Sequence, residues 1–422
     1  TSTNKTAKDP ELAKLDKALG GVLEAVFKDE GFAGKRGRTV KIPARGRVKA
    51  KWVVVVGIKG LSDVDAARAL GHAAAKSSTR QKSAAIVLSA ISADTVRAAT
   101  EATMLGTYRY SDYKTGSRKP KGGLSKATLL VGDPKDAALR DALKAGQALA
   151  DSIALARDLV NGPPNDLNPI TLAEIAKTEA EKLGLKVTIW GKKQIEKAGM
   201  RLFLAVNRGS ALEPRFIHIS YVPEGPAPKG GWKKVAFVGK GLTFDSGGLC
   251  IKPPKSMIDM KCDMAGAATT LGIVLAAARL KLPVAVDAII GSTENMAGAE
   301  AYRPGDVFTS LDGKTVEIIN TDAQGPLVLA PVLPWTRANP TPDVMIDHAT
   351  LTGACMVALG AHRAAFYTDD EELASGYSQA ATEADQRYWR MPLHTTRPST
   401  LESPNAHLKH PGSSHGRSTT AG

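Results

Sequence analysis

Acidic, lysine and amide side chains gather in three short polar segments in the C-terminal half of the chain. The first follows the apolar run KVAFVG, and the last follows the run VEIIN. The residues are, in chain order, Lys240, Asp245, Lys252, Asp263, Asp322 and Gln324. Carboxylates brought together from separate strand ends repel one another unless protons or cations neutralise them. A pair of divalent ions would do so, and such a pair is also suited to hydrolysis.

Each of these residues also has a simpler explanation. In the simpler interpretation, Asp263 only caps the helix predicted by MAGAATTLGIVLAAARL, which it precedes, and Asp322 only stabilises a turn. Solvated surface charge explains Lys240 and Lys252. Their combination, beside glycine pairs that let a backbone approach a ligand closely, favours a ligand site. The eight histidines are scattered and no cysteine pair has zinc-finger spacing, which indicates against a metal site built from histidine or cysteine.

The pattern of apolar runs predicts an α/β fold with two domains. Residues 1 to 135 alternate buried-strand patterns (VVVV, AAIVLSA, ATLLVG) with helical patterns, and residues 136 to 165 read as a connecting helix and linker that breaks at GPPN. Residues 166 to 422 alternate strands and helices again. This alternation predicts a mostly parallel central sheet covered by helices, with ligands at the carboxyl ends of its strands.

Composition limits the classes of protein that remain possible. The chain has 422 residues, of which 43% are hydrophobic, and no run of about 18 apolar residues is present. The first thirty residues are charged and do not have the form of a signal peptide. The three cysteines lack a C-x-x-C pair and fit reduced thiols. We therefore expect a soluble cytoplasmic protein with no membrane partner.

The net charge of +14 lies entirely in the N-terminal part of the chain. Residues 1 to 150 hold 28 lysines and arginines against 14 aspartates and glutamates, and the remainder holds 28 of each. The densest basic clusters are Lys35 to Arg38 and Arg118 to Lys121. This asymmetry indicates DNA or an acidic partner, although a merely solvated basic face is the simpler interpretation.

Several long motifs in fixed order resemble the leucyl aminopeptidase family of metallo-exopeptidases (peptidase family M17, cytosol aminopeptidases). They are VGKGLTFDSGGLCIKP, MKCDMAGAA, AYRPGD, NTDAQGPLVLA and DHATLTGACMVALG, and the similarity runs from LGTYRYSDYK to the end, about three quarters of the chain. The resemblance implies hydrolysis of the N-terminal residue of peptides by a water that two divalent cations activate. It also implies a homohexamer.

The resemblance assigns a role to each matching residue. Lys252 would support the developing oxyanion, and Lys240 would bind a cation as the uncharged amine. The implied cation ligands are Lys240, Asp245, Asp263, Asp322 and the residue at position 324. The implied substrate contacts are Met260, Thr350, Leu351 and Gly353. Zn²⁺ and Mn²⁺ suit such ligands, and so do Mg²⁺ and Co²⁺.

The chain departs from the family pattern N-T-D-A-E-G-R at residues 320 to 326. Gln324 stands where the family has a glutamate that helps bridge the metals, so one negative charge is missing and at least one cation should bind more weakly. Pro326 replaces the arginine that holds a bicarbonate acting as base, so the bicarbonate site is expected to be lost. The loss of a positioned base typically costs about 10²–10⁴-fold in rate.

The C-terminal segment departs too, because LKHPGSSHGRSTTAG differs from the family's LKNxGGR-like turn. We interpret His407, His410 and His415 as exposed loop residues. Two hypotheses follow from these departures. One is an aminopeptidase with reduced turnover, and the other is an inactive family member that serves as a structural or DNA-binding assembly.

Overall fold

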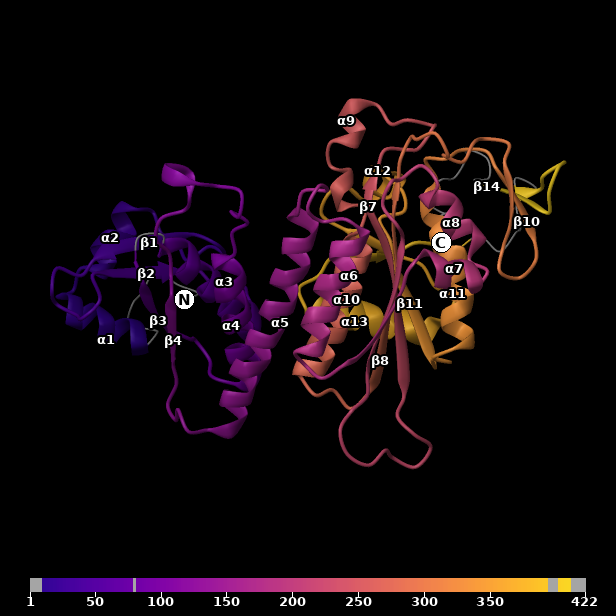
Figure 1. The fold of residues 1–422 in the computed structure, drawn as a ribbon. Helices are drawn as coiled ribbons and strands as arrows, with labels where there is room; N and C mark the ends of the chain where they lie inside the picture. The colour runs from indigo at the N-terminus through magenta and orange to yellow at the C-terminus, as the bar shows by residue number, and fades with distance from the viewer. Residues whose placement is uncertain (1–9, 79–80, 394–400, 411–422) are drawn as a thin grey trace. The chain divides into compact units, whose positions relative to one another are not determined.

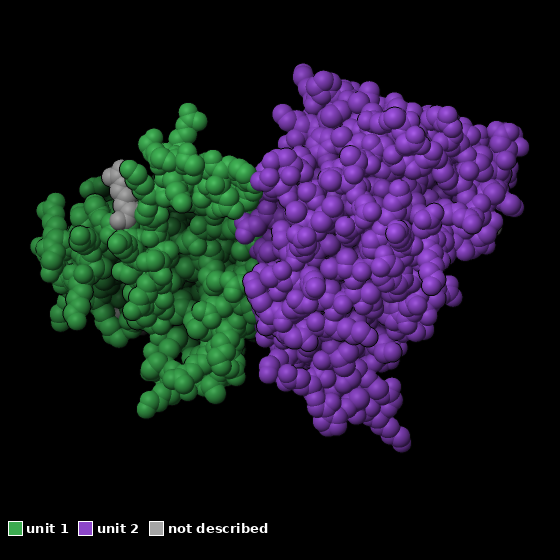
Figure 2. Space-filling model, viewed as in Figure 1, with its two compact units in different colours: residues 1–154 green, residues 155–422 purple. Residues whose placement is uncertain are grey.

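The protein consists of two compact units, Thr1–Ala154 and Leu155–Gly422. Each unit contains helices and strands (Figure 1), and Figure 2 colours the two units separately. The computed structural model describes residues 10–78, 81–393 and 401–410. The predicted two-domain α/β architecture is confirmed. The division between the units falls within helix α5 (Ala137–Asn161), in the segment interpreted as a connector. The finer domain limits at residues 135 and 165 remain predictions.

The first unit pairs its strands two at a time. β1 and β2 are antiparallel, and β3 and β4 are parallel. The helical patterns predicted between the strands are present as α3 and α4, and the side chains of Ser62 and Ser92 cap their N-termini. The prediction of buried strands is wrong for β4, which is exposed along most of its length, because only its Leu129 side packs on the core. The elements are α1 (Pro10–Leu19), α2 (Leu23–Asp29), β1 (Thr39–Pro43), β2 (Trp52–Val56), α3 (Asp63–Ser77), β3 (Ser83–Val87), α4 (Ala93–Thr107), η2 (Gly116–Arg118) and β4 (Lys126–Leu130).

The second unit begins after the G-P-P-N breaker at residue 162, where α5 ends. Asn168 caps the next helix, and Pro169 occupies its first turn, where its missing N–H has no intrahelical partner to lose. The elements of this unit are α6 (Pro169–Glu181), β5 (Lys186–Trp190), α7 (Lys192–Lys197), α8 (Arg201–Asn207), β6 (Arg215–Tyr221), β7 (Lys234–Asp245), α9 (Pro254–Met257), η3 (Met260–Cys262), α10 (Ala265–Arg279), β8 (Ala285–Asn295), β9 (Val307–Thr309), β10 (Thr315–Ile318), α11 (Gln324–Ala338), β11 (Val344–His348), α12 (Ala354–Leu359), β12 (Ala364–Phe366), α13 (Glu371–Glu383), β13 (Tyr388–Arg390) and β14 (Leu408–His410).

The central sheet of the second unit is mixed, and it is mostly parallel as predicted, because four of its five strands run in one direction and only β6 runs against them. Its strand order is β11-β7-β8-β6-β5. The pairs β11–β7 and β7–β8 are parallel, whereas β6–β8 and β5–β6 are antiparallel. The segment VPEGPAPKGGWK between β6 and β7 is rich in proline and glycine and contains no helix. Without a helical crossover, the chain re-enters the sheet at the end where it left, and β7 runs opposite to β6.

Helices cover both faces of this sheet, as the alternation of its side chains requires. In β7, Phe237 packs with α6 and α10 on one face, while Ala236 and Val238 pack with α8 and α11 on the other. The near-continuous apolar run of β8 is explained in the same way, because both of its faces are buried. The stretch Pro254–Arg279 is apolar enough to pass as a membrane span, with mean hydropathy 1.2, but 67% of that window is buried. Packing in the core therefore accounts for its composition.

Candidate functional site

A β-bulge in β7 turns Lys240 and Asp245 to the same face of the central sheet. Side chains five residues apart on a regular strand point to opposite faces. Here the register with β8 shifts between Leu242 and Phe244, so Thr243 is an extra residue that reverses the alternation. Both polar residues are almost completely buried. The sequence placed them after the apolar run KVAFVG, whereas they lie on the strand itself, because β7 and β8 continue to pair beyond their apolar runs.

Asp263 is held by donors from three separate elements. Its Oδ1 accepts from Lys240 Nζ at 2.7 Å and from Thr350 Oγ1 at 2.6 Å. Its Oδ2 accepts from Gln324 Nε2 at 2.9 Å. Lys240 Nζ also donates to the carbonyl of Thr350 at 3.0 Å. Gln324 is the first residue of α11 and is 3% exposed, and its Oε1 has no partner among the described residues.

Lys252 joins the other two carboxylates. Its Nζ lies 2.9 Å from Asp245 Oδ2 and 2.5 Å from Asp322 Oδ1. The Oδ1 of Asp245 accepts from the Gly247 N–H at 2.9 Å and from Asn295 Nδ2 at 2.8 Å. Lys252 therefore stands between Asp245 and Asp322, whereas Lys240 pairs with Asp263. Accordingly, no three His, Cys, Asp or Glu side chains in the described part of the chain form a group close enough to hold a metal by themselves.

The turn that carries Asp322 is anchored through Thr321, whose backbone carbonyl accepts from Tyr302 OH at 2.7 Å and from Asn295 Nδ2 at 3.0 Å. The Thr321 hydroxyl donates to the Gly247 carbonyl at 2.7 Å. The sequence interpretation missed Asn295, Tyr302 and Thr321 as site residues. Asn295 follows the predicted strand AVDAIIG and is the last residue of β8, so the rule that singled out Asp245 after KVAFVG could have found it.

Asp322 reaches the site from a different sheet than expected. β10, which precedes it, belongs to a three-stranded sheet of order β14-β10-β9 and is not part of the central sheet. Asp322 is therefore not at the end of a central strand. It enters the site because the Thr321 contacts dock its turn against the end of β7.

Burial sets the proton affinities of the ionisable groups. Burial raises the pKa of Asp263, nearby Asp245 raises it further, and Lys240 opposes both. Burial also raises the pKa of Asp322, and its contacts with Lys252 only partly offset this. Burial by itself would lower the pKa of Lys252, but the two carboxylates outweigh burial and raise it. The carboxylates thus lie in an environment that disfavours their charge, which an added cation would correct.

The remaining predicted residues lie around this cluster with fewer contacts. The Leu351 side chain is half-buried beside Gly325, Met260 is half-buried at the start of η3, and Gly353 is exposed before α12. Pro326 is a half-buried residue in the first turn of α11, where a proline removes no helical hydrogen bond.

The C-terminal histidines differ among themselves. His407 is exposed, as expected. The prediction of an exposed loop residue is wrong for His410, which lies on β14 and is half-buried. Its ring forms a hydrogen bond with the carbonyl of Ala323. β14 pairs with β10, and this pairing brings His410 toward the turn that carries Asp322. His415 lies outside the described residues.

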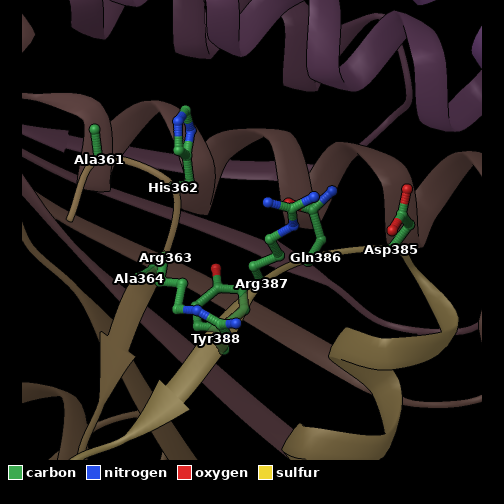
Figure 3. Close-up of a pocket in the computed structure, with 8 residues that line it drawn as sticks. All are labelled: Ala361, His362, Arg363, Ala364, Asp385, Gln386, Arg387 and Tyr388. Carbon is green, nitrogen blue, oxygen red and sulfur yellow. The ribbon is translucent and has the colours of Figure 1, made fainter. Parts of the chain in front are cut away.

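A surface cavity of about 700 Å³ lies elsewhere in the second unit, at the start of β12 and β13 (Figure 3). It is lined by Ala361, His362, Arg363, Ala364, Asp385, Gln386, Arg387 and Tyr388. None of the residues predicted for the site lines it, so we base the function on the buried cluster.

Comparison with known proteins agrees with this geometry. The model of the cytosol aminopeptidase family, catalytic domain, matches residues 154–422, and the model of the N-terminal domain of the same family matches residues 2–117. The chain belongs to the cytosol aminopeptidase family. The resemblance inferred from the motifs is thereby confirmed, and the family assignment supports a peptidase.

Relatives within the cytosol aminopeptidase family cover most of the chain. A probable cytosol aminopeptidase of Streptomyces coelicolor is 39% identical over 433 residues, covering 98% of this chain and 83% of the relative. One from Aquifex aeolicus is 40% identical over 392 residues, covering 92% and 77%. Among solved structures, a mutant of tomato leucine aminopeptidase has a TM-score of 0.87 and 33% identity, with 98% of this chain and 81% of that chain covered. The bottromycin maturation enzyme BotP in complex with Mn has a TM-score of 0.84 and 33% identity, covering 94% and 85%.

Proposed function

We propose that this protein is a divalent-cation-dependent exopeptidase of the leucyl aminopeptidase type, with turnover reduced by Gln324 and Pro326. The observation that carries the proposal is the convergence of three aspartates and two lysines from separate segments in one buried cluster. Buried charges at this density are costly unless they serve binding or catalysis, and active sites are where such clusters concentrate.

The residues present fit a divalent cation. Lys252 places a positive charge between two carboxylates, at 2.9 Å and 2.5 Å, and so stands where a cation could bind. Gln324 leaves a buried amide oxygen without a partner among the described residues. Carboxylate and amide oxygens are ligands that Mn²⁺ and Mg²⁺ prefer. We propose the following ligands: Lys240, Asp245, Asp263, Asp322 and, more weakly, Gln324.

When bound, the cations would lower the pKa of a water and polarise the scissile carbonyl. The protein's own groups would then act on the substrate. Lys252, released from its carboxylate partners, would donate to the developing oxyanion. Thr350, Leu351 and Gly353 would hold the peptide, with Met260 beside its first side chain. In this proposal the substrate's free α-amine is required for binding, which restricts cleavage to the N-terminal residue.

Two substitutions lower the expected rate. Gln324 carries no charge and presents a single coordinating oxygen, so it neutralises less of the cations' charge than a carboxylate would. Pro326 has no donors, so a bicarbonate held at this position as a base is lost. The loss of a positioned base alone predicts a rate about 10²–10⁴-fold below that of a competent enzyme.

The test is hydrolysis of leucyl amide with added Mn²⁺ or Zn²⁺, with the parent assayed beside the double variant Gln324→Glu, Pro326→Arg. We expect slow but measurable leucine release by the parent and a gain of about 10²–10⁴-fold in the double variant. Leucine release no greater than that of a metal-only blank, by both proteins at high concentration, would end the proposal. The single variants serve as controls that separate the metal ligand from the lost base.

A second candidate function rests on the charge of the N-terminal part, and we propose it as the alternative. The basic clusters Lys35 to Arg38 and Arg118 to Lys121 are exposed, so an inactive family member could bind DNA through them. Such binding should weaken steeply as salt concentration rises, because counterions are released from the phosphates. A gel-shift titration measures this, and the absence of a shift at low salt would exclude the DNA-binding function.

A homohexamer is proposed on family resemblance alone, and mass measurement in solution tests it.

A further inference from the structure

The buried cluster has two halves that differ in charge. We define the Asp263 half as Lys240, Asp263 and Gln324, and the Asp245 half as Asp245, Lys252 and Asp322. In the absence of a cation, the Lys240 ammonium and the Asp263 carboxylate form an ion pair beside the neutral Gln324 amide, so the formal charges of the Asp263 half cancel. The Asp245 half contains two carboxylates and one lysine, so it carries an excess negative charge. A dication is attracted to uncompensated negative charge, and only the Asp245 half offers it.

The Asp263 carboxylate is also satisfied by hydrogen bonds. Its Oδ1 receives two donors and its Oδ2 receives the Gln324 amide, all within 2.9 Å. The residue is 4% exposed. A cation that bound Oδ2 would have to displace the Gln324 amide and leave it without this partner in a buried position, which is unfavourable. A glutamate at position 324 could not donate this hydrogen bond and would add a second negative charge.

In the Asp245 half, a cation can replace the Lys252 ammonium more readily. Lys252 is the charge between its two carboxylates, and the Asp322 side chain is 34% exposed, so the ammonium can leave toward solvent. The Gly247 N–H and the Asn295 amide hold Oδ1 of Asp245, which leaves Oδ2 as the atom that faces Lys252. A cation that replaced the ammonium would find one oxygen of each carboxylate already directed toward the same point.

We propose that this protein holds a single divalent cation strongly, between Asp245 and Asp322, and that Gln324 removes the second strong site by neutralising and hydrogen-bonding the Asp263 half. The inference rests on the cation dependence in the proposed function and goes beyond it, because it fixes the number of ions and their position. The feature that decides the stoichiometry is the amide at position 324.

The first test measures stoichiometry directly. The full-length protein is stripped with a chelator, titrated with Mn²⁺ in a calorimeter, and analysed for bound metal after dialysis. We expect about one strongly bound ion per chain, with an electron paramagnetic resonance signal typical of isolated Mn²⁺. Two ions per chain that both survive dialysis, with the signal of a coupled pair, would overturn the inference.

The second test changes the amide. Gln324→Glu gives the Asp263 half an excess negative charge, so we expect two retained ions and the appearance of the coupled-pair signal. Gln194→Glu is the matched control. Gln194 is exposed and its Oε1 only accepts a hydrogen bond from the Gly191 N–H, which a carboxylate does equally well. This control should keep a single ion. A single retained ion in folded Gln324→Glu would show that the amide does not set the number.

These outcomes are separable from those of the peptidase assay. One strongly bound ion without leucine release would retain this inference and remove the proposed function. Leucine release with two strongly bound ions would remove this inference and retain the proposed function. Asp322→Asn locates the ion, because it should abolish strong binding, whereas strong binding unchanged in this variant would place the cation in the Asp263 half and overturn the inference.

Discussion

Replacement of Gln324 by glutamate should destabilise the metal-free protein, and the contact with Asp263 gives the size of the effect. Gln324 Nε2 now lies 2.9 Å from Asp263 Oδ2. A glutamate would put two like charges at this distance, a repulsion of about 6 kcal/mol if the effective dielectric constant is about 20. Protonation of one carboxyl relieves this repulsion. At pH 7 this protonation costs about 4 kcal/mol for an ordinary glutamate pKa of about 4.3. Because protonation is less costly than the repulsion, the loss of folding free energy is limited to about 4 kcal/mol.

The expected result is a lower melting temperature in the presence of a chelator. A loss of about 4 kcal/mol in a unit of this size lowers the midpoint by about 8–16 °C. The glutamate's pKa is raised in the folded state, so the destabilisation grows as pH rises above its unfolded pKa. The penalty should therefore shrink to about 1 kcal/mol at about pH 5. Added Mn²⁺ should restore most of the stability, because the cation binds only the folded protein.

Differential scanning fluorimetry with chelator, at these two pH values, measures the effect. Gln194→Glu is the control for an added carboxylate on the surface and should melt with the parent. If Gln324→Glu in chelator at pH 7 melted within about 2 °C of the parent, position 324 would not be in contact with a charged Asp263, and the reasoning would be refuted.

Two further predictions concern packing and pH. Gly325→Ala would place a Cβ 2.6 Å from Leu351 Cδ1 and 3.2 Å from Lys240 Nζ, so we expect a loss of about 1–3 kcal/mol in thermal unfolding together with lower leucine release. Gly376→Ala, with open space around its Cβ, should not be destabilised. Burial by itself would raise the pKa of Asp287, but hydrogen bonding, chiefly from His218, outweighs burial and lowers it. Its contribution to stability is therefore present above its unfolded pKa of about 3.9 and lost as pH falls through the lower folded value. Urea unfolding should show this pH dependence in the parent and much less of it in Asp287→Asn, and equal dependence in both would contradict the assignment.

The sequence by itself determined the class of fold and the family. Apolar runs of buried-strand length, alternating with helical patterns, predicted β5 to β8 and β11. The reason is clearest for β8, whose run is apolar because both faces of the strand are buried. The order of long motifs predicted the family, and the mismatches at Gln324 and Pro326 were visible without coordinates.

Only the tertiary structure decided how the residues meet. The bulge at Thr243 depends on pairing with β8, so no local pattern indicates that Lys240 and Asp245 share a face. Similarly, Asp322 joins them through a turn docked by Asn295 from another strand. The donor that each carboxylate oxygen receives depends on contacts between segments far apart in the chain. For that reason, the charge balance of the two halves, and with it the expected number of cations, follows from the folded arrangement and not from the residue types alone.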